Sequence, residues 1–391
     1  MASKTKVEKS NLPAIKQEPT TSKSNGLIGK LQTFFPLDAL PFVHQKHSLL
    51  GVDITSQTVK VLGLSQDSHG YTVTHYSKEA LPLGAISDRE IKQPEAVSAA
   101  IKQAIAQANY SGGNVAIAMP SVNVITKIIQ VNASLSDYEL ETLLRVEAEK
   151  YIPHPMEEVQ LDFHVLGPVE KNPDQVNVVL IAALLNNIDE RVNLVKAAGF
   201  NVKVVDVEAY AIERATSVAL AHLPVESLRG IVAVFDIGAN MMAVNVMVDN
   251  QLIYTREESF GGSQLTAALQ EQLNINYHEA EKIKLSTDTS KGELAEAIAA
   301  FQRSIGIQLQ RSLQLFFSAT QYSKVDLIVL AGGVAAMPGL AEALQTKLEE
   351  TVILANPLQN MAFAPHLNAE LIKHEAGSLM AVTGLALRAF D

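Results

Sequence analysis

The chain is organised around one hydrophobic pattern, which lies between Ile231 and Asn240. Its apolar residues lead into Asp236 as those of a buried strand do, and the chain then turns. A second apolar run spans 243–248, and a third, at 252–255, returns after turn-like residues. The pattern predicts a hairpin with a carboxylate at a strand end and free backbone N–H groups in its turn. Such N–H groups suit phosphate oxygens, and the carboxylate suits a hydrated Mg²⁺.

A second copy of this pattern lies earlier in the chain. Leu49 to Thr55 is an apolar run that contains Asp53, and Val59 to Leu62 continues after a polar turn. In both copies a valine stands eight residues past the Asp, Val61 here and Val244 there. The repetition predicts two similar hairpins in two similar domains.

A third stretch, Leu327 to Gly339, is an apolar strand that breaks at Gly332-Gly333 and continues as a helix. Each of the three stretches alone is better explained as an ordinary strand end. As an ordered set, two Asp hairpins and a glycine turn predict one nucleotide held between two similar domains.

Composition narrows the class of protein. The chain has 391 residues, enough for two or more domains, and 47% of them are hydrophobic, as in soluble globular proteins. The lack of cysteine excludes disulfides and cysteine-bound metal, and the net charge of −11 disfavours nucleic-acid binding. The sequence has neither a signal-peptide core nor an apolar stretch of about 20 residues, so we expect a soluble cytoplasmic protein.

The N-terminal segment differs from the rest. Residues 1–26 are mostly polar, and six Lys against two Glu up to Lys30 give the segment a charge of +4. We expect a disordered tether, with a weak basic contact to anionic lipid or an acidic partner as the alternative. The apolar residues of 26–41 predict either a helix on a membrane surface or a clasp on the folded body, and Pro36 and Pro41 favour the clasp.

The remaining pattern predicts an α/β fold. Besides the second hairpin and the glycine stretch, strands are predicted at 49–64, 71–76, 114–119, 125–131, 159–166, 176–184 and 202–207. Helices are predicted at 94–109, 136–151, 189–198, 208–215 and 375–390, with a helical region over 263–317. Ser136 and Glu139 have the spacing of a capping box. The strands and helices from 125 to 198 stand between the two Asp hairpins and predict a small inserted subdomain.

These motifs resemble a known group of proteins. The Asp53 hairpin, the helix at Glu208, the Asp236 hairpin and Gly332-Gly333 occur in the order of the actin-like ATPases, which include actin, the heat-shock chaperone ATPases, FtsA and MreB. Further stretches resemble the PilM family of type IV pili: Glu147-Ala-Glu-Lys-Tyr-Ile-Pro153, Glu158-Val-Gln-Leu-Asp-Phe163, Asp206-Val-Glu-Ala-Tyr210, Phe260-Gly-Gly-Ser-Gln-Leu-Thr266 and Ala280-Glu-Lys-Ile-Lys284. The resemblance runs from about Leu49 to the C-terminus.

The resemblance implies an actin-like ATPase fold, with two lobes around a nucleotide cleft and an FtsA-like inserted subdomain. The implied parts are a tail with the clasp (1–44), the core of the first lobe (45–122), the inserted subdomain (123–200), a return to the first lobe (201–229), the core of the second lobe (230–263 and 323–374), a helical subdomain (264–322) and a C-terminal helix on the first lobe (375–391).

The resemblance also implies a site for ATP and Mg²⁺. Asp53 and Asp236 would hold the metal through waters, and Glu208 would orient the attacking water as general base or positioner. The other residues implied in nucleotide binding come from the two turns, the glycine loops and one helical face: Thr55, Ser56, Gln57, Thr58, Lys60, Gly238, Ala239, Asn240, Gly261, Gly262, Glu281, Lys284, Gly332, Gly333 and Val334.

Several of these residues keep a simpler alternative. Lys60 faces either phosphate or, on an alternating strand, solvent. Glu208 also suits a helix N-terminus through the macrodipole, and Glu281 with Lys284 suits a solvated helix pair. Thr55 stands where the family usually has glycine; a positive φ there would strain the turn, which puts ATP hydrolysis in doubt more than binding.

Three functions follow. The first is an ATP-binding cytoplasmic scaffold of type IV pilus biogenesis, acting in pilus assembly, twitching motility or DNA uptake. It would bind the N-terminal cytoplasmic tail of the membrane protein PilN through a groove in the inserted stretch 123–185, and through PilN it would reach PilO and PilP. Pilus motor or platform proteins are further candidate partners, and contact with the inner membrane would be indirect.

The second function is an active ATPase or a sugar kinase, although no carboxylate base for a sugar pocket stands out in the sequence. The third is a filament-forming, self-associating actin-like ATPase of cell division or cell shape. Sedimentation in the presence of ATP separates the third function from the first.

Overall fold

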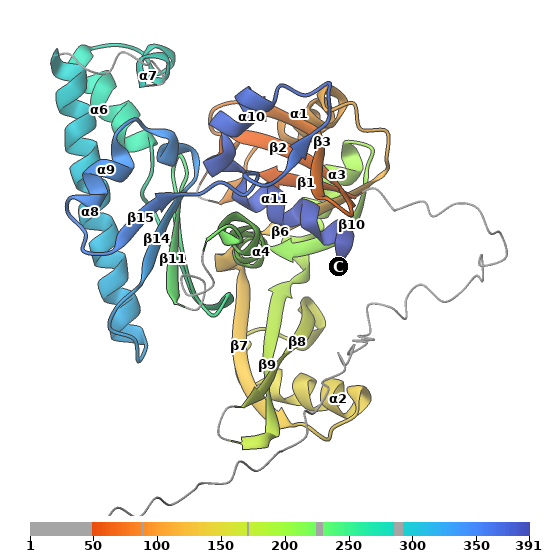
Figure 1. The fold of residues 1–391 in the computed structure, drawn as a ribbon. Coiled ribbons are helices and arrows are strands. Elements are labelled where there is room, and N and C mark those ends of the chain that lie inside the picture. Colours follow the sequence, from red (N-terminus) through yellow and green to blue (C-terminus); the bar gives the residue numbers. More distant parts are fainter. Residues whose placement is uncertain (1–48, 88, 170–171, 224–229, 285–291) are drawn as a thin grey trace, which may run out of the picture.

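The computed structural model describes residues 49–391 except 88, 170–171, 224–229 and 285–291 (Figure 1). The predicted tether at 1–26 and the apolar segment at 26–41 lie outside the described residues. Two large sheets stand side by side, and a smaller sheet lies below them in the view of Figure 1.

The first sheet has six strands in the order β10-β6-β1-β2-β3-β16. They are β1 (Leu49–Ile54), β2 (Thr58–Asp67), β3 (Gly70–Ala80), β6 (Asn114–Met119), β10 (Asn201–Val207) and β16 (Ala362–Phe363). Two helices, α1 (Pro94–Gln107) and α3 (Leu185–Ala197), bury their apolar sides against one face of this sheet. We call this sheet and its two helices lobe 1. A short pair, β4 (Ile86–Ser87) and β5 (Glu90–Ile91), lies between β3 and α1 in the chain.

The second sheet has five strands in the order β13-β12-β11-β14-β15. They are β11 (Ile231–Ile237), β12 (Met242–Val248), β13 (Gln251–Glu258), β14 (Leu327–Ala331) and β15 (Thr351–Leu354). One face packs against α6 (Ser263–Leu273), α7 (Tyr277–Lys284), α8 (Gly292–Ala319) and α9 (Leu340–Gln345). We call this sheet and these helices lobe 2.

Apart from the short β16, which is parallel to β3 and has no counterpart in the second sheet, the two sheets have the same topology. In each, an antiparallel hairpin lies next to a third antiparallel strand on one side and two parallel strands on the other. Asp53 stands one residue before the end of β1, and Asp236 stands at the same place in β11. Both Asp residues therefore lie at the carboxyl end of a strand that is antiparallel to one neighbour and parallel to the other. Open α/β sheets bind ligands at the carboxyl ends of strands, where the strand order reverses.

Two helices fill the space between the lobes. They are α4 (Glu208–Leu220) and α11 (Met380–Leu387), and all eight residues of α11 are buried. One side of α11 packs on lobe 1 and the other on lobe 2. The helices cross so closely that a Cβ at Gly384 would lie 1.8 Å from the carbonyl oxygen of Ala211. Only glycine fits at this crossing.

The stretch predicted as an inserted subdomain contains a third sheet with the order β7-β9-β8, covered by one helix. Its elements are β7 (Val124–Asn132), α2 (Asp137–Ala148), β8 (Val159–Val169) and β9 (Asn172–Leu184). This unit ends at Leu184 and not at 200, because α3, which was predicted as part of it, packs on lobe 1. The capping box is confirmed, because the Ser136 hydroxyl accepts the N–H of Glu139 and the Glu139 carboxylate accepts the N–H of Ser136. A separate apolar core, which includes Leu144 and Leu180, holds the helix to the sheet.

Several predicted elements have different limits in the structure, among them two helices. The helix predicted at 189–198 begins at Leu185, because β9 ends at Leu184 and the chain enters α3 directly, without a side-chain cap. The helix predicted at 375–390 is divided into a 3₁₀ helix (Ala376–Leu379), α11 and a second 3₁₀ helix (Arg388–Phe390). A short helix α10 (Ala369–His374) precedes them. None of the described helices combines the length and apolar character that crossing a bilayer requires.

Candidate functional site

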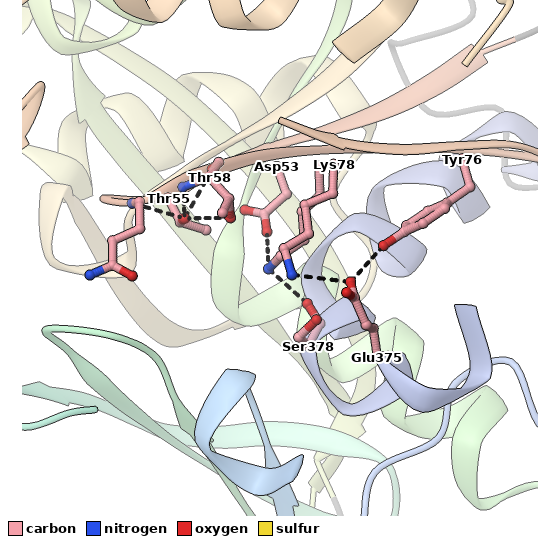
Figure 2. Close-up of polar contacts among 9 residues, drawn as sticks. Asp53, Thr55, Thr58, Tyr76, Lys78, Glu375 and Ser378 are labelled. Carbon is pink, nitrogen blue, oxygen red and sulfur yellow. Dashed lines mark hydrogen bonds and ion pairs between the residues drawn. The ribbon is translucent and has the colours of Figure 1, made fainter. Parts of the chain in front are cut away.

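The first hairpin places two opposite charges next to each other. Asp53 on β1 is paired across the ladder with Lys60 on β2. The Lys60 Nζ lies 3.4 Å from Asp53 Oδ2 and donates to the carbonyl oxygen of Ser378 at 2.8 Å (Figure 2). The solvent-facing alternative for Lys60 is therefore wrong, because both of its contacts hold the ammonium inside the protein.

The second hairpin repeats the closure of the first. The N–H of Gly238 donates to the carbonyl oxygen of Met241 at 2.9 Å, and the N–H of Thr55 donates to that of Thr58 at 2.9 Å. Neither Thr55 nor Gly238 has a positive φ. The expected strain at Thr55 is therefore absent, since the turn is built from conformations open to any residue.

Electrostatic interactions link the two Asp residues. The pKa of Asp236 is raised to about 6, chiefly by burial; the Lys60 ammonium lowers it and the negative charge of Asp53 adds to the rise. Asp53 and Lys60 on the first hairpin are therefore close enough to influence the protonation of Asp236 on the second.

Glu208 is the first residue of α4 and joins this group. The pKa of its carboxyl is raised to about 8, chiefly by burial and then by the charges of Asp53, Glu257 and Asp236, while Arg191 lowers it. Glu208 therefore carries a proton at neutral pH in the protein alone. A bound cation near Asp53 and Asp236 would favour its ionised form.

Arg191 is a charged residue of this region that the sequence analysis missed. It lies on α3 and is 7% exposed, and within the described part of the chain its guanidinium makes no hydrogen bond or ion pair. Burial lowers its pKa, while Glu208, Glu190, Asp53 and Glu257 raise it. The sequence could have identified Arg191, because helical spacing places it with Leu194 and Val195 on the face of the helix that should be apolar.

The two glycines after β14 have different surroundings. Gly332 has φ +84°, and a Cβ there would lie 2.3 Å from the carbonyl oxygen of Ile237 and 2.6 Å from Asp236 Oδ1. A Cβ on Gly333 would meet nothing within 4 Å, and Gly333 is exposed. Gly332 thus brings β14 against the second hairpin, and Gly333 leaves an open backbone face beside it.

The loop after β13 lies on the second turn. The N–H of Gly262 donates to the carbonyl oxygen of Gly238 at 3.0 Å, and a Cβ on Gly261 would lie 2.4 Å from that of Ala239. Val334 is buried next to Gly262, because a Cβ on Gly262 would lie 3.1 Å from Val334 Cγ2.

Glu281 and Lys284 border the same loop. Lys284 Nζ lies 2.5 Å from Glu281 Oε1 and donates to Thr266 Oγ1 at 2.9 Å. The same ammonium lies 3.6 Å from the place of a Cβ on Gly262. The pair is thus fixed to α6 and is not the freely solvated pair of the simpler alternative.

Side chains join the two turns across the space between the lobes. Asn240 Nδ2 donates to Ser56 Oγ at 3.2 Å, and Asn240 Oδ1 accepts from Ser263 Oγ at 2.6 Å. Gln57 Nε2 donates to the Tyr277 hydroxyl at 3.1 Å. The structure therefore brings together the residues that the sequence assigned to the two turns, the glycine loops and α7.

The donor set fits a magnesium nucleotide. Among the described residues no three His, Asp or Glu side chains form a metal cage. Mg²⁺ commonly keeps several waters and uses one or two carboxylates, which Asp53 and Asp236 supply. The open face at Gly333 suits a nucleoside. Two surface hollows of about 520 and 200 Å³ lie along Tyr76, Gln107 and Leu371; the larger one is also lined by Thr58, and neither is lined by Asp53, Asp236 or Gly333.

Comparison with known proteins decides the family. Residues 51–390 match the family described as "Type IV pilus assembly protein PilM". The chain belongs to the PilM family. A solved structure described as a "PilM-PilN type IV pilus biogenesis complex" superposes with a TM-score of 0.73 at 26% identity, covering 88% of this chain and 98% of that one.

Two more distant structures share the fold of this PilM-family chain. One is the ethanolamine utilization protein EutJ from Carboxydothermus hydrogenoformans, with a TM-score of 0.54 and 15% identity over 89% of this chain and 90% of that one. The other is a diol dehydratase-reactivating factor in nucleotide-free form, with a TM-score of 0.50 and 10% identity over 88% and 99%. The chain thus has the actin-like ATPase fold, as the resemblance implied.

Proposed function

We propose that this chain is a cytoplasmic, ATP-binding scaffold of type IV pilus assembly that binds the N-terminal tail of PilN. Membership of the PilM family supports the pilus role. The observation that carries the nucleotide site is the meeting of two matched hairpins, each with an Asp at its strand end, beside the open face of Gly333.

The second turn supplies the phosphate contacts in this proposal. Within the described residues the N–H groups of Ala239 and Asn240 have no hydrogen-bond partner, so they are free to donate to phosphate oxygens. The nucleoside lies along Gly333, bordered by Lys284 and Glu281. Asp53 and Asp236 hold Mg²⁺ through waters, and the metal would neutralise phosphate charge.

Lys60 and Glu208 complete the proposed site. The Lys60 ammonium lies between the carboxylate of Asp53 and the turn at Ser378, so it limits the negative charge against which a phosphate must bind. Glu208 orients water. Its pKa is about 8 in the protein alone, and Mg²⁺ between Asp53 and Asp236 would lower that pKa toward the ionised form that a water-orienting carboxylate needs.

The inserted subdomain is the proposed place of the partner groove. It carries six of the twelve exposed large hydrophobic side chains of the described chain: Ile128, Tyr138, Leu143, Val146, Tyr151 and Val165. Its strands β7 and β8 are both edges of the three-stranded sheet. An open edge beside apolar side chains suits an extended peptide, and the similar PilM structure was solved as a complex with PilN.

Calorimetric titration with Mg-ATP tests the nucleotide site. We expect Asp236→Ala to weaken binding at least tenfold, because the variant loses a carboxylate facing the metal. Asp189→Ala, an exposed carboxylate on α3, is the control and should bind like wild type. Equal affinity of Asp236→Ala and wild type would contradict the site.

A second titration tests the partner groove, with a synthetic peptide of the PilN cytoplasmic tail. Ile128→Asp and Val165→Asp place a charge on side chains that are 50% and 43% exposed, so the fold should tolerate them. The two residues lie on opposite edge strands, so the one at the edge that the peptide occupies should weaken binding severalfold and the other should stay near wild type. Ile307→Asp is the matched control, because Ile307 is 66% exposed on α8 of lobe 2. Equal weakening by all three variants, or by none, would remove the groove from this subdomain.

A further inference from the structure

The two hairpin turns have the same backbone closure but differ in one side chain. Thr55 stands at the place that Gly238 occupies in the second turn, two residues past the Asp in each case. Thr55 adds a hydroxyl to the inside of its turn, and Gly238 adds nothing. Both turns belong to this one chain.

The Thr55 hydroxyl accepts hydrogen bonds from backbone N–H groups of its own turn (Figure 2). Its Oγ1 accepts the N–H of Thr58 at 3.0 Å and that of Gln57 at 3.4 Å. It also lies 2.9 Å from the carbonyl oxygen and 3.1 Å from the hydroxyl of Thr58, so it both donates and accepts. Among the N–H groups of Ser56, Gln57 and Thr58, only that of Ser56 has no partner within the described residues.

The second turn keeps its donors free. Ala239 and Asn240 use their carbonyl and side-chain atoms to hold the loop at 261–263, while their N–H groups have no partner in the described chain. A phosphate oxygen can therefore bind the second turn without breaking a bond. At the first turn only the Ser56 N–H is free within the described residues, and a phosphate must displace the Thr55 hydroxyl before it gains the N–H groups of Gln57 and Thr58.

We propose that Thr55 is an affinity-determining residue, whose hydroxyl replaces phosphate in the first turn and leaves the second turn to hold the nucleotide. This inference rests on the proposed nucleotide site. The first turn then contacts lobe 2 through side chains, with Ser56 on Asn240 and Gln57 on Tyr277. The chain would hold Mg-ATP weakly compared with its own variant that lacks this hydroxyl.

Calorimetric titration of Mg-ATP into wild type, Thr55→Ala and Thr55→Ser tests the inference. Alanine removes the hydroxyl and releases two N–H groups, so its dissociation constant should fall about tenfold. Serine keeps the hydroxyl and should bind within about twofold of wild type. Thr55→Gly, whose backbone is freer, should follow alanine in direction.

A second readout does not depend on the nucleotide. Amide hydrogen exchange at Gln57 and Thr58 should become faster in Thr55→Ala and stay slow in Thr55→Ser, since only serine can accept those N–H groups. Equal exchange in the two variants would overturn the assignment of the hydroxyl, whatever the titration gives.

The two proposals fail in different ways. Mg-ATP binding by wild type with unchanged or weaker binding by Thr55→Ala overturns the inference and leaves the nucleotide site standing. No binding by any of these proteins overturns both, because released donors facing a phosphate site should create measurable affinity.

Discussion

Asn240 and Ser56 join the two halves of the molecule, since the Asn240 amide donates to the Ser56 hydroxyl at 3.2 Å. The other end of the same amide accepts from Ser263, which fastens the second turn to the glycine loop behind it. One side chain therefore fixes the second turn and closes the first turn onto it.

Asn240→Ala should loosen both turns. It removes two side-chain hydrogen bonds at a partly exposed place, so we expect a loss of about 1 kcal/mol of stability. Hydrogen exchange should become faster in both turns and unchanged in β6. Asn186→Ala, on the exposed side of α3, is the control. Faster exchange confined to lobe 2 would mean that the bond to Ser56 does not hold the lobes together.

The neighbouring glycines 332 and 333 should respond in opposite ways to alanine. Gly332→Ala forces a Cβ to 2.3 Å from the carbonyl oxygen of Ile237 at a positive φ, so it should lose about 3 kcal/mol or more of stability. Gly333→Ala meets open space and should melt within about 1 °C of wild type, yet bind Mg-ATP more weakly. Thermal melts and titrations measure both, and normal nucleotide binding by Gly333→Ala would place the nucleoside elsewhere.

Gly384→Ala should disrupt the contact between the central helices. The added Cβ would lie 1.8 Å from the carbonyl oxygen of Ala211, so α11 and α4 must separate. We expect a loss of about 3 kcal/mol or more, seen as a lower melting temperature. Gly113→Ala is the control, because its nearest neighbour would be the Asn201 amide at 3.7 Å. Equal melting temperatures would mean that the helices are not packed this closely.

Glu208 should make stability fall as pH rises. The folded carboxyl has a pKa of about 8, above its ordinary value near 4.5, so the folded state keeps a proton that the unfolded state releases. Stability is therefore lost between about pH 4.5 and 8. In Glu208→Gln the fall in melting temperature from pH 6 to 8.5 should shrink by about 2 °C. The fall below pH 6 should persist, because Asp236, with a pKa of about 6, is unchanged.

Arg191 should set the position of that pH window. Its positive charge lowers the pKa of Glu208, so Arg191→Met should raise that pKa and move the loss of stability to higher pH. Arg191→Lys keeps the charge and should stay near wild type. In a Glu208→Gln background, Arg191→Met should no longer change the pH dependence of stability above pH 6. A shift that persists there would mean that Arg191 acts on another carboxyl.

The hairpins, the inserted subdomain and the family were predictable from the sequence because they are local patterns. Alternating apolar residues end at Asp53 and Asp236, and the Ser136–Glu139 capping box is contained in four residues. The bond between Ser56 and Asn240 was not predictable, since it joins residues 184 positions apart and depends on how the lobes close.

Two residues mark the limit of local reasoning. The Thr55 hydroxyl caps its own turn, whereas the sequence predicted backbone strain, because φ depends on a turn type that the residues 55–58 do not specify. The place of Arg191 on the apolar face of α3 could be read from the sequence, but its electrostatic interaction with Glu208 follows only from the packing of α3 in the fold.

The central claim is that a magnesium nucleotide binds between the two hairpins. The most direct measurement is a crystal structure grown with a non-hydrolysable Mg-ATP analogue. The proposal predicts phosphate density against the N–H groups of Ala239 and Asn240, with the nucleoside along Gly333. Density for the analogue outside the space between Asp53 and Asp236, or none at saturating concentration, would contradict it.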